Sequence, residues 1–290
     1  MAINKNSNVY TIIYTVVMVV IVGALLAFLA TSLKEKQDAN VLNDQKFSIM
    51  KAFGAANDKS DKAETINLFK ENVTIGEVNV VKVGEEVTAT ANWLDSKSET
   101  YDKDEDKIFT ILGDRKKLAK LDNNFPIFKY VNDKGENLYV LPMTGAGLWG
   151  DIWGYVAINE KLEISGIVMA HAGETPGLGA EIATQKVQDK FAKKVLFDAN
   201  GDFAVEMVKG MTKKDAEKTS SKVDAITGGT KTCDGVNLML KESICKYEEF
   251  LKSLAVSTSE DTTNEVESTD GDKSAEGENP ENVEPINVEE

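Results

Sequence analysis

The chain is poor in the residues on which metal and disulfide chemistry depend. Its 290 residues include one histidine and two cysteines. Cys233 and Cys245 lie twelve positions apart in a predicted helix, which would separate their Cα atoms by about 18 Å, whereas a disulfide tolerates about 7 Å. Two cysteines with one distant histidine also make a poor metal site. We therefore expect neither an intrachain disulfide nor a bound metal.

Positive charge is also scarce. The chain has 33 Lys and Arg against 48 Asp and Glu, a net charge of −15. Residues 256–290 contain 12 acids and one lysine, a net charge of −11, which leaves about −4 for the rest. No basic stripe exists to neutralise phosphates, so nucleic-acid binding is not expected. We interpret the acidic tail as a disordered, solvated appendage, with contact to a partner as the alternative.

One long apolar run is present near the amino terminus. Residues 9–33 contain no charge, and about 25 residues can cross a hydrocarbon core of about 30 Å. A cleaved signal peptide is the alternative, but its apolar region would be shorter and would end at an Ala-x-Ala-like site. The flanking charges do not fix the orientation. We predict a single transmembrane anchor over 1–33, a folded domain over 34–255 and the tail over 256–290.

The middle of the chain reads as an α+β domain with a mainly antiparallel sheet packed by helices. Apolar residues at helical spacing predict helices over 35–53 and 62–72, which we expect to lift the domain off the membrane. β-branched runs between Gly, Asn and Asp turns predict strands, over 78–83, 87–93, 127–131, 138–141, 152–158 and 163–169. Further elements are expected as a helix over 180–197, a strand near 203–208 and an amphipathic helix over 232–254. The charged residues 96–107 are expected to form an exposed loop or hairpin tip.

A glycine-rich segment at 145–150 (Gly-Ala-Gly-Leu-Trp-Gly) fits the G-x-G-x-x-G pattern of dinucleotide-binding folds. Its context does not fit, because a strand is predicted where the phosphate-binding helix should begin. We interpret it as a bend that brings Trp149 to a surface or into a cleft.

Two other segments are candidates for a binding site. Residues 224–232 (Asp-Ala-Ile-Thr-Gly-Gly-Thr-Lys-Thr) place Thr230 beside the start of the last predicted helix, where free amides and the helix dipole favour an anion. The alternative is an ordinary loop with Thr232 as the helix cap. Residues 173–181 (Gly-Glu-Thr-Pro-Gly-Leu-Gly-Ala-Glu) predict a tight Pro-Gly turn that leads into a helix. His171, just before it, is interpreted as a satisfied or solvent-facing ring, with a catalytic role as the alternative.

The 224–232 segment resembles the attachment motif of the FMN-binding domain family, in which a threonine hydroxyl is esterified to the FMN phosphate. In this sequence that residue is Thr230. Thr227, Gly229 and Ala225 depart from the usual residues but keep the site small. The Glu-Thr-Pro-Gly-Leu-Gly loop resembles the family's second signature, which lies against the flavin ring. The resemblance implies a set of cofactor-binding residues, namely Thr230, Asp224, Thr227, Gly228, Gly229, Thr232, Glu174, Thr175, Gly177, Leu178 and Trp149.

The anchor, the Gly-Leu-Trp bend at 147–149 and both signatures together resemble the C subunits of sodium-translocating NADH:quinone oxidoreductases. The G subunits of Rnf electron-transport complexes are the alternative; they tend to be shorter and usually lack Gly-Leu-Trp. The resemblance implies a single-pass protein of the bacterial inner membrane, with a periplasmic domain that carries covalent FMN added by a flavin transferase. It further implies electron transfer within a complex that oxidises NADH, reduces quinone and exports Na⁺, with other subunits as partners. No complete active site for NADH oxidation and no catalytic side chain are expected on this chain.

Two other classes of function stay open from the sequence. A membrane-anchored binding module without redox activity would use the same anchor and sheet and would be colourless. A flavin-binding sensor would be yellow but would lack partner subunits.

Overall fold

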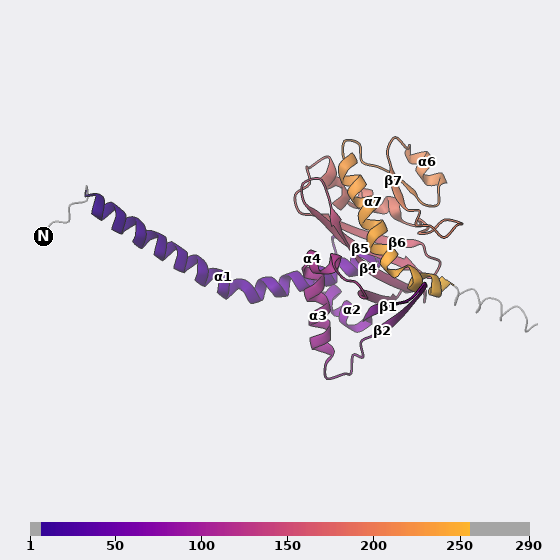
Figure 1. The fold of residues 1–290 in the computed structure, drawn as a ribbon, viewed down its shortest axis with the longest axis horizontal. Helices are drawn as coiled ribbons and strands as arrows, with labels where there is room; N and C mark the ends of the chain where they lie inside the picture. Colours follow the sequence, from indigo (N-terminus) through magenta and orange to yellow (C-terminus); the bar gives the residue numbers. More distant parts are fainter. Residues whose placement is uncertain (1–6, 256–290) are drawn as a thin grey trace, which may run out of the picture.

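The computed structural model describes residues 7–255, so the predicted acidic tail lies outside the described residues. The first element, α1 (Asn8–Ala52), is 45 residues long and extends away from the rest of the molecule (Figure 1). Its most apolar 18-residue window has a mean hydropathy of 2.9 and is not buried against any other part of the structure. By length and composition α1 is therefore a candidate membrane span, as the apolar run predicts.

The helix predicted over 35–53 is not a separate element, because α1 continues through it without a break. Residues 34–52 contain neither glycine nor proline, so nothing in the backbone ends the helix there. The last turns of α1 do more than lift the domain: Ile49, Met50 and Ala52 are fully buried. The end of α1 is thus part of the hydrophobic core.

A six-stranded antiparallel sheet forms the centre of the domain, in the order β2-β1-β3-β4-β5-β6. Its strands overlap all six predicted ones, and the structure extends most of them; they are β1 (Val73–Val83), β2 (Glu86–Trp93), β3 (Asn124–Val131), β4 (Asn137–Ala146), β5 (Asp151–Asn159) and β6 (Ile164–His171). The antiparallel α+β prediction is confirmed.

Each face of the sheet is covered by its own set of helices. Tyr139 and Leu141 belong to the cluster beneath α7 (Thr230–Ile244), whereas the alternate residues Leu138 and Val140 belong to the cluster on the opposite face. This alternation follows from the two-residue period of a strand. The second face is covered by the end of α1, α2 (Lys62–Asn72) and α3 (Tyr101–Gly113).

Two predictions of local structure are wrong. The segment 96–107, expected as a loop or hairpin tip, contains the start of α3, because Ile108, Phe109 and Leu112 form a buried apolar face that holds this charged helix on the domain. The helix expected over 180–197 is instead three short helical pieces, η1 (Gly179–Ala183), α5 (Gln185–Gln188) and η2 (Asp189–Phe191).

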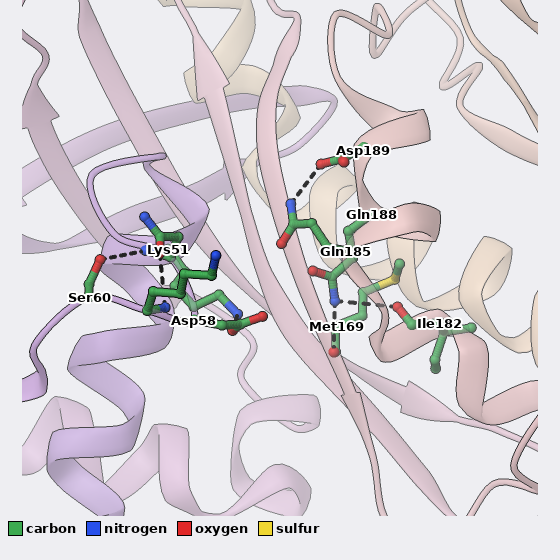
Figure 2. A network of polar contacts seen from close by, with 10 residues as sticks. Lys51, Asp58, Ser60, Met169, Ile182, Gln185, Gln188 and Asp189 are labelled. Carbon is green, nitrogen blue, oxygen red and sulfur yellow. Dashed lines mark hydrogen bonds and ion pairs between the residues drawn. The ribbon is translucent and has the colours of Figure 1, made fainter.

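The 180–197 segment is broken at Thr184. Thr184 is extended, with φ −84° and ψ 144°, which interrupts the helix. The buried Gln188 amide then donates to the carbonyls of Met169 on β6 and Ile182 on η1, at 3.1 and 3.4 Å (Figure 2). The Gln188 side chain thus makes hydrogen bonds to other elements at the point where a continuous helix was expected.

The shortest helices and strands of the fold were largely missed from the sequence. The expected strand near 203–208 is only β7 (Glu206–Val208), which pairs in parallel with β8 (Lys222–Asp224). The helices α4 (Arg115–Ala119) and α6 (Lys213–Lys218) were not predicted, since five or six residues carry little periodic signal. The closing helix begins at Thr230, two residues earlier than predicted, and helical structure continues beyond α7 through η3 (Cys245–Tyr247) to residue 255.

Candidate functional site

A small cleft lies where the two signature segments and the Gly-Leu-Trp bend meet. It has a volume of about 130 Å³ and is lined by residues from these three parts of the chain, namely Leu148, Glu174, Thr175, Leu178, Gly179, Gly228, Gly229, Thr230, Lys231 and Thr232. The fold therefore brings together three segments that the sequence singled out separately.

The first turn of α7 opens into this cleft without a side-chain cap. Its N-cap is Gly229, and the first helical bond runs from the Cys233 amide to the Gly229 carbonyl at 2.9 Å. The amides of residues 230–232 therefore have no partner within the helix. The first turn also carries no acidic residue. This terminus has the free donors and the dipole that bind an anion.

The backbone before the helix depends on glycine. Gly228 has a φ of +78°, which is strained for other residues, and a Cβ there would collide with the Leu178 side chain. The loop of Gly177 and Leu178 thus packs directly against the attachment segment.

The three threonines of the segment differ in what their hydroxyls do. Thr232 is buried and donates to Glu174 Oε2 at 2.6 Å. Thr230 is half-buried in the cleft, and its hydroxyl bonds to no residue that the structure describes. Thr227 is exposed and does not line the cleft. Thr232 is the third residue of α7, so the alternative that it caps the helix is wrong.

Glu174 occupies the buried centre of the site. Its side chain accepts a hydrogen bond from the Thr232 hydroxyl and one from the Trp149 amide at 2.9 Å. Burial raises the pKa of Glu174, but hydrogen bonds from Thr232 and from the amides of Trp149 and Leu148, together with nearby His171, outweigh burial and leave the pKa lowered. An ionised carboxylate is therefore held inside the site.

The Gly-Leu-Trp bend is a hairpin turn between β4 and β5. The Gly147 amide donates to the Gly150 carbonyl at 2.8 Å, and β5 follows directly. The prediction of a strand in place of a phosphate-binding helix is confirmed. The exposed side chains of Leu148 and Leu178 line the cleft and give it an apolar rim. Trp149 is 68% exposed and does not line the cleft.

The Pro-Gly loop is a tight turn, as predicted. The amides of Leu178 and Ala180 both donate to the Thr175 carbonyl at 3.1 Å, and Gly177 has a φ of +76°. His171 ends β6, and its Nδ1 accepts a hydrogen bond from the Glu174 amide at 3.2 Å. The ring is thus engaged in holding the start of the loop.

Some predicted site residues lie outside the cleft. Asp224 ends β8 and pairs with Lys190, whose Nζ lies 3.0 Å from the carboxylate and 3.1 Å from the Asp224 carbonyl. Three lining residues were not predicted, namely Leu148, Gly179 and Lys231. Each is a sequence neighbour of a predicted residue, and that adjacency was the available signal.

The size of the cleft limits what it can enclose. Typical small-molecule pockets measure about 300–1,000 Å³, so a cleft of about 130 Å³ holds only part of a flavin nucleotide. The uncapped helix terminus suits the phosphate, and the exposed apolar rim suits a ring that stays outside. The residues therefore fit the FMN that the resemblance implies.

Comparison with known proteins gives consistent matches. Residues 147–244 match the family model of the FMN-binding domain, a span that contains every residue lining the cleft. The C subunit of the Na(+)-translocating NADH-quinone reductase from Haemophilus ducreyi is 30% identical over 240 residues, covering 82% of this chain and 90% of that protein. The C subunit from Pseudomonas aeruginosa is 26% identical over 254 residues, covering 87% and 97% respectively.

A solved structure has the same fold. The crystal structure of the C subunit of the Na(+)-translocating NADH-quinone reductase from Parabacteroides distasonis has a TM-score of 0.56 and 31% sequence identity. The match covers 76% of this chain and 96% of that chain.

Proposed function

The chain belongs to the family of C subunits of Na(+)-translocating NADH-quinone reductases, and we propose on this basis that it is the FMN-carrying electron-transfer subunit of such a complex. The cofactor is joined by a phosphoester to Thr230. The complex oxidises NADH, reduces quinone and exports Na⁺, and this chain supplies no complete site for NADH oxidation. Its partners are the other subunits of the complex.

The observation that carries the proposal is the uncapped start of α7 with the Thr230 hydroxyl beside it. Free amides at residues 230–232 suit a phosphate, and the Thr230 hydroxyl makes no bond within the described chain. In maturation by a flavin transferase, the new bond joins Thr230 Oγ1 to phosphorus. The hydroxyl loses its proton, and an activated flavin phosphate, the transferase's co-substrate, loses its leaving group.

The other residues of the site position the cofactor. Gly228 and Gly229 let the backbone approach the phosphate, and Lys231 adds a positive charge at the cleft. Trp149, Thr175 and Leu178 flank the ring from the exposed rim. The flavin, when bound, supplies the electron-transfer chemistry, so the chain needs no general acid or base.

The proposed location is supported by α1 and by the family. We propose that residues 1–33 anchor the protein in the bacterial inner membrane and that residues 34–255 form a periplasmic domain. The exposed apolar length of α1 supports a span. A tether keeps the shallow site close to redox partners in the membrane, and the covalent bond prevents loss of a cofactor that the cleft only partly encloses.

The test is in-gel fluorescence of the protein expressed in membranes together with a flavin transferase. The wild-type band should fluoresce under ultraviolet light after denaturation, and Thr230→Ala should be dark. Thr88→Ala removes the same atoms from an exposed position on β2 and should stay fluorescent. A dark wild-type band would overturn the proposal and favour a binding module without a flavin.

A further inference from the structure

The Glu174 side chain joins three segments that are distant in sequence. Its two carboxylate oxygens accept hydrogen bonds from the amide of Trp149 in the β4–β5 hairpin and from the hydroxyl of Thr232 on α7. The residue itself belongs to the Pro-Gly loop, where its amide donates to His171. One buried carboxylate thus contacts both the element that carries the exposed tryptophan and the helix that carries Thr230.

The surroundings are shaped to admit this carboxylate and little else. A Cβ at Gly147 would collide with Glu174 Oε1, and a Cβ at Gly179 would collide with both Glu174 Oε2 and the Thr232 hydroxyl. Glu174 is 4% exposed, although it lines the cleft. Both oxygens are committed to protein donors, which leaves little of the carboxylate to contact a ligand.

We propose that Glu174 is a positioning residue that fixes the hairpin of Trp149 relative to the start of α7, and thereby the flavin ring relative to its attachment point. This inference rests on the proposed function. It replaces the direct contact with the cofactor that the resemblance implies for Glu174. The carboxylate acts through Thr232 and the Trp149 amide.

A carboxylate is required because each oxygen faces a donor. In Glu174→Gln one acceptor becomes an NH₂ group, which must then face either the Trp149 amide or the Thr232 hydroxyl. If the remaining oxygen stays on the Trp149 amide, the NH₂ group can donate to the Thr232 oxygen, but the Thr232 hydroxyl then loses the acceptor for its own proton. The Trp149 hydrogen bond also loses its ionised acceptor, and a hydrogen bond to a charged group contributes more than a neutral one. A residue that only contacted the ring would tolerate this change in the absence of flavin.

The experiment compares the full-length protein made with and without a flavin transferase, as Glu174→Gln, Thr232→Val and the double variant. Without flavin, each single variant should lower the thermal unfolding midpoint by about 3–8 °C. The midpoint of the double variant should be no lower than that of the more destabilised single variant. With flavin, both variants should change the visible circular dichroism of the bound flavin in the same way. Thr232→Ser restores the hydroxyl and should restore both signals.

Glu181→Gln is the matched control, because Glu181 is a half-buried carboxylate on η1 that does not line the cleft; it should leave both signals at wild-type values. The inference is overturned if Glu174→Gln leaves the flavin-free midpoint unchanged, or if the effects of Glu174→Gln and Thr232→Val add. A wild-type protein without bound flavin would sink the proposed function, whereas the flavin-free midpoints would still test the role of Glu174.

Discussion

Thr230 and Thr232 are separated by one residue in α7, yet their chemistry differs because of what surrounds each hydroxyl. The hydroxyl of Thr232 is bound to a buried carboxylate, and that of Thr230 bonds to no described residue. An esterified threonine oxygen has lost its proton and can no longer donate to a carboxylate. The environment of each side chain, more than its residue type, therefore distinguishes the proposed attachment site.

Glycine at position 179 is needed for this environment. Gly179→Ala would place a methyl group against Glu174 and Thr232, and we expect it to destabilise the domain by about 1–3 kcal/mol, as other overpacked sites do. Gly173→Ala has no atom within 4 Å of the new methyl and should change stability by less than about 0.5 kcal/mol. Chemical denaturation measures both, and equal effects would contradict this account.

The lowered pKa of Glu174 predicts a pH dependence. The folded-state pKa lies below its ordinary value of 4.5, with His171 as a neighbouring ionisable group that contributes. The ionised carboxylate therefore stabilises the fold above the unfolded-state pKa, and this contribution is lost as pH falls through the folded-state pKa.

Glu174→Gln isolates this contribution from those of other carboxylates. The difference in unfolding free energy between wild type and variant should be largest above about pH 5 and should shrink as the pH falls below about 4. Urea denaturation across this range measures the difference. A difference that does not vary with pH would show that ionisation of Glu174 does not stabilise the fold.

At the scale of elements, α1 is joined to the domain by a buried ion pair. Lys46 Nζ lies 2.7 Å from Glu105 on α3 and is placed over the rings of Phe69 and Phe109. The Lys46 side chain is 4% exposed and that of Glu105 15%. Two helices on this face of the sheet are thus held together through a charge enclosed by aromatic rings.

Removing this lysine should be costly, because Glu105 would remain largely buried without its partner. We expect Lys46→Ala to destabilise the domain by about 2–4 kcal/mol. Lys62→Ala breaks an exposed pair between α2 and Asp44 on α1 and should cost at most about 1 kcal/mol. Denaturant unfolding of both variants tests the difference, and a loss for Lys46→Ala no larger than that for Lys62→Ala would refute it.

At the scale of the whole molecule, the apolar length of α1 is separate from the domain core. Residues 11–33 are exposed throughout, whereas the buried side chains of α1 begin at Lys46. Nothing in the core depends on the apolar half of the helix. The anchor and the domain are therefore separable in packing, although one continuous helix joins them.

Deletion of residues 1–33 should release a folded domain. The shortened protein should move from the membrane to the soluble fraction, unfold within a few degrees of the full-length protein and still accept flavin from the transferase. Fractionation, thermal unfolding and in-gel fluorescence measure these properties. Aggregation, or retention in the membrane, would contradict the expected separation.

The sequence by itself determined the elements with a strong periodic or compositional signal. The apolar run, the strand pattern from residue 73 onward, the 62–72 helix and the amphipathic closing helix could be predicted from local pattern. The FMN site was indicated by the resemblance of two segments to known family signatures, since small residues and hydroxyls before a helix left an ordinary loop as an alternative. These features depend on neighbours within a few residues.

Only the tertiary structure decided the rest. Beside the break in the 180–197 segment, the Gln188 side-chain amide bonds to the Met169 carbonyl on β6, and the end of α1 is buried against the sheet face that it covers. Glu174 and Thr232 are 58 residues apart in sequence and 2.6 Å apart in space. Hydrogen bonds and burial of this kind follow from long-range packing, which leaves no local pattern in the sequence to reveal which threonine is committed and which is free.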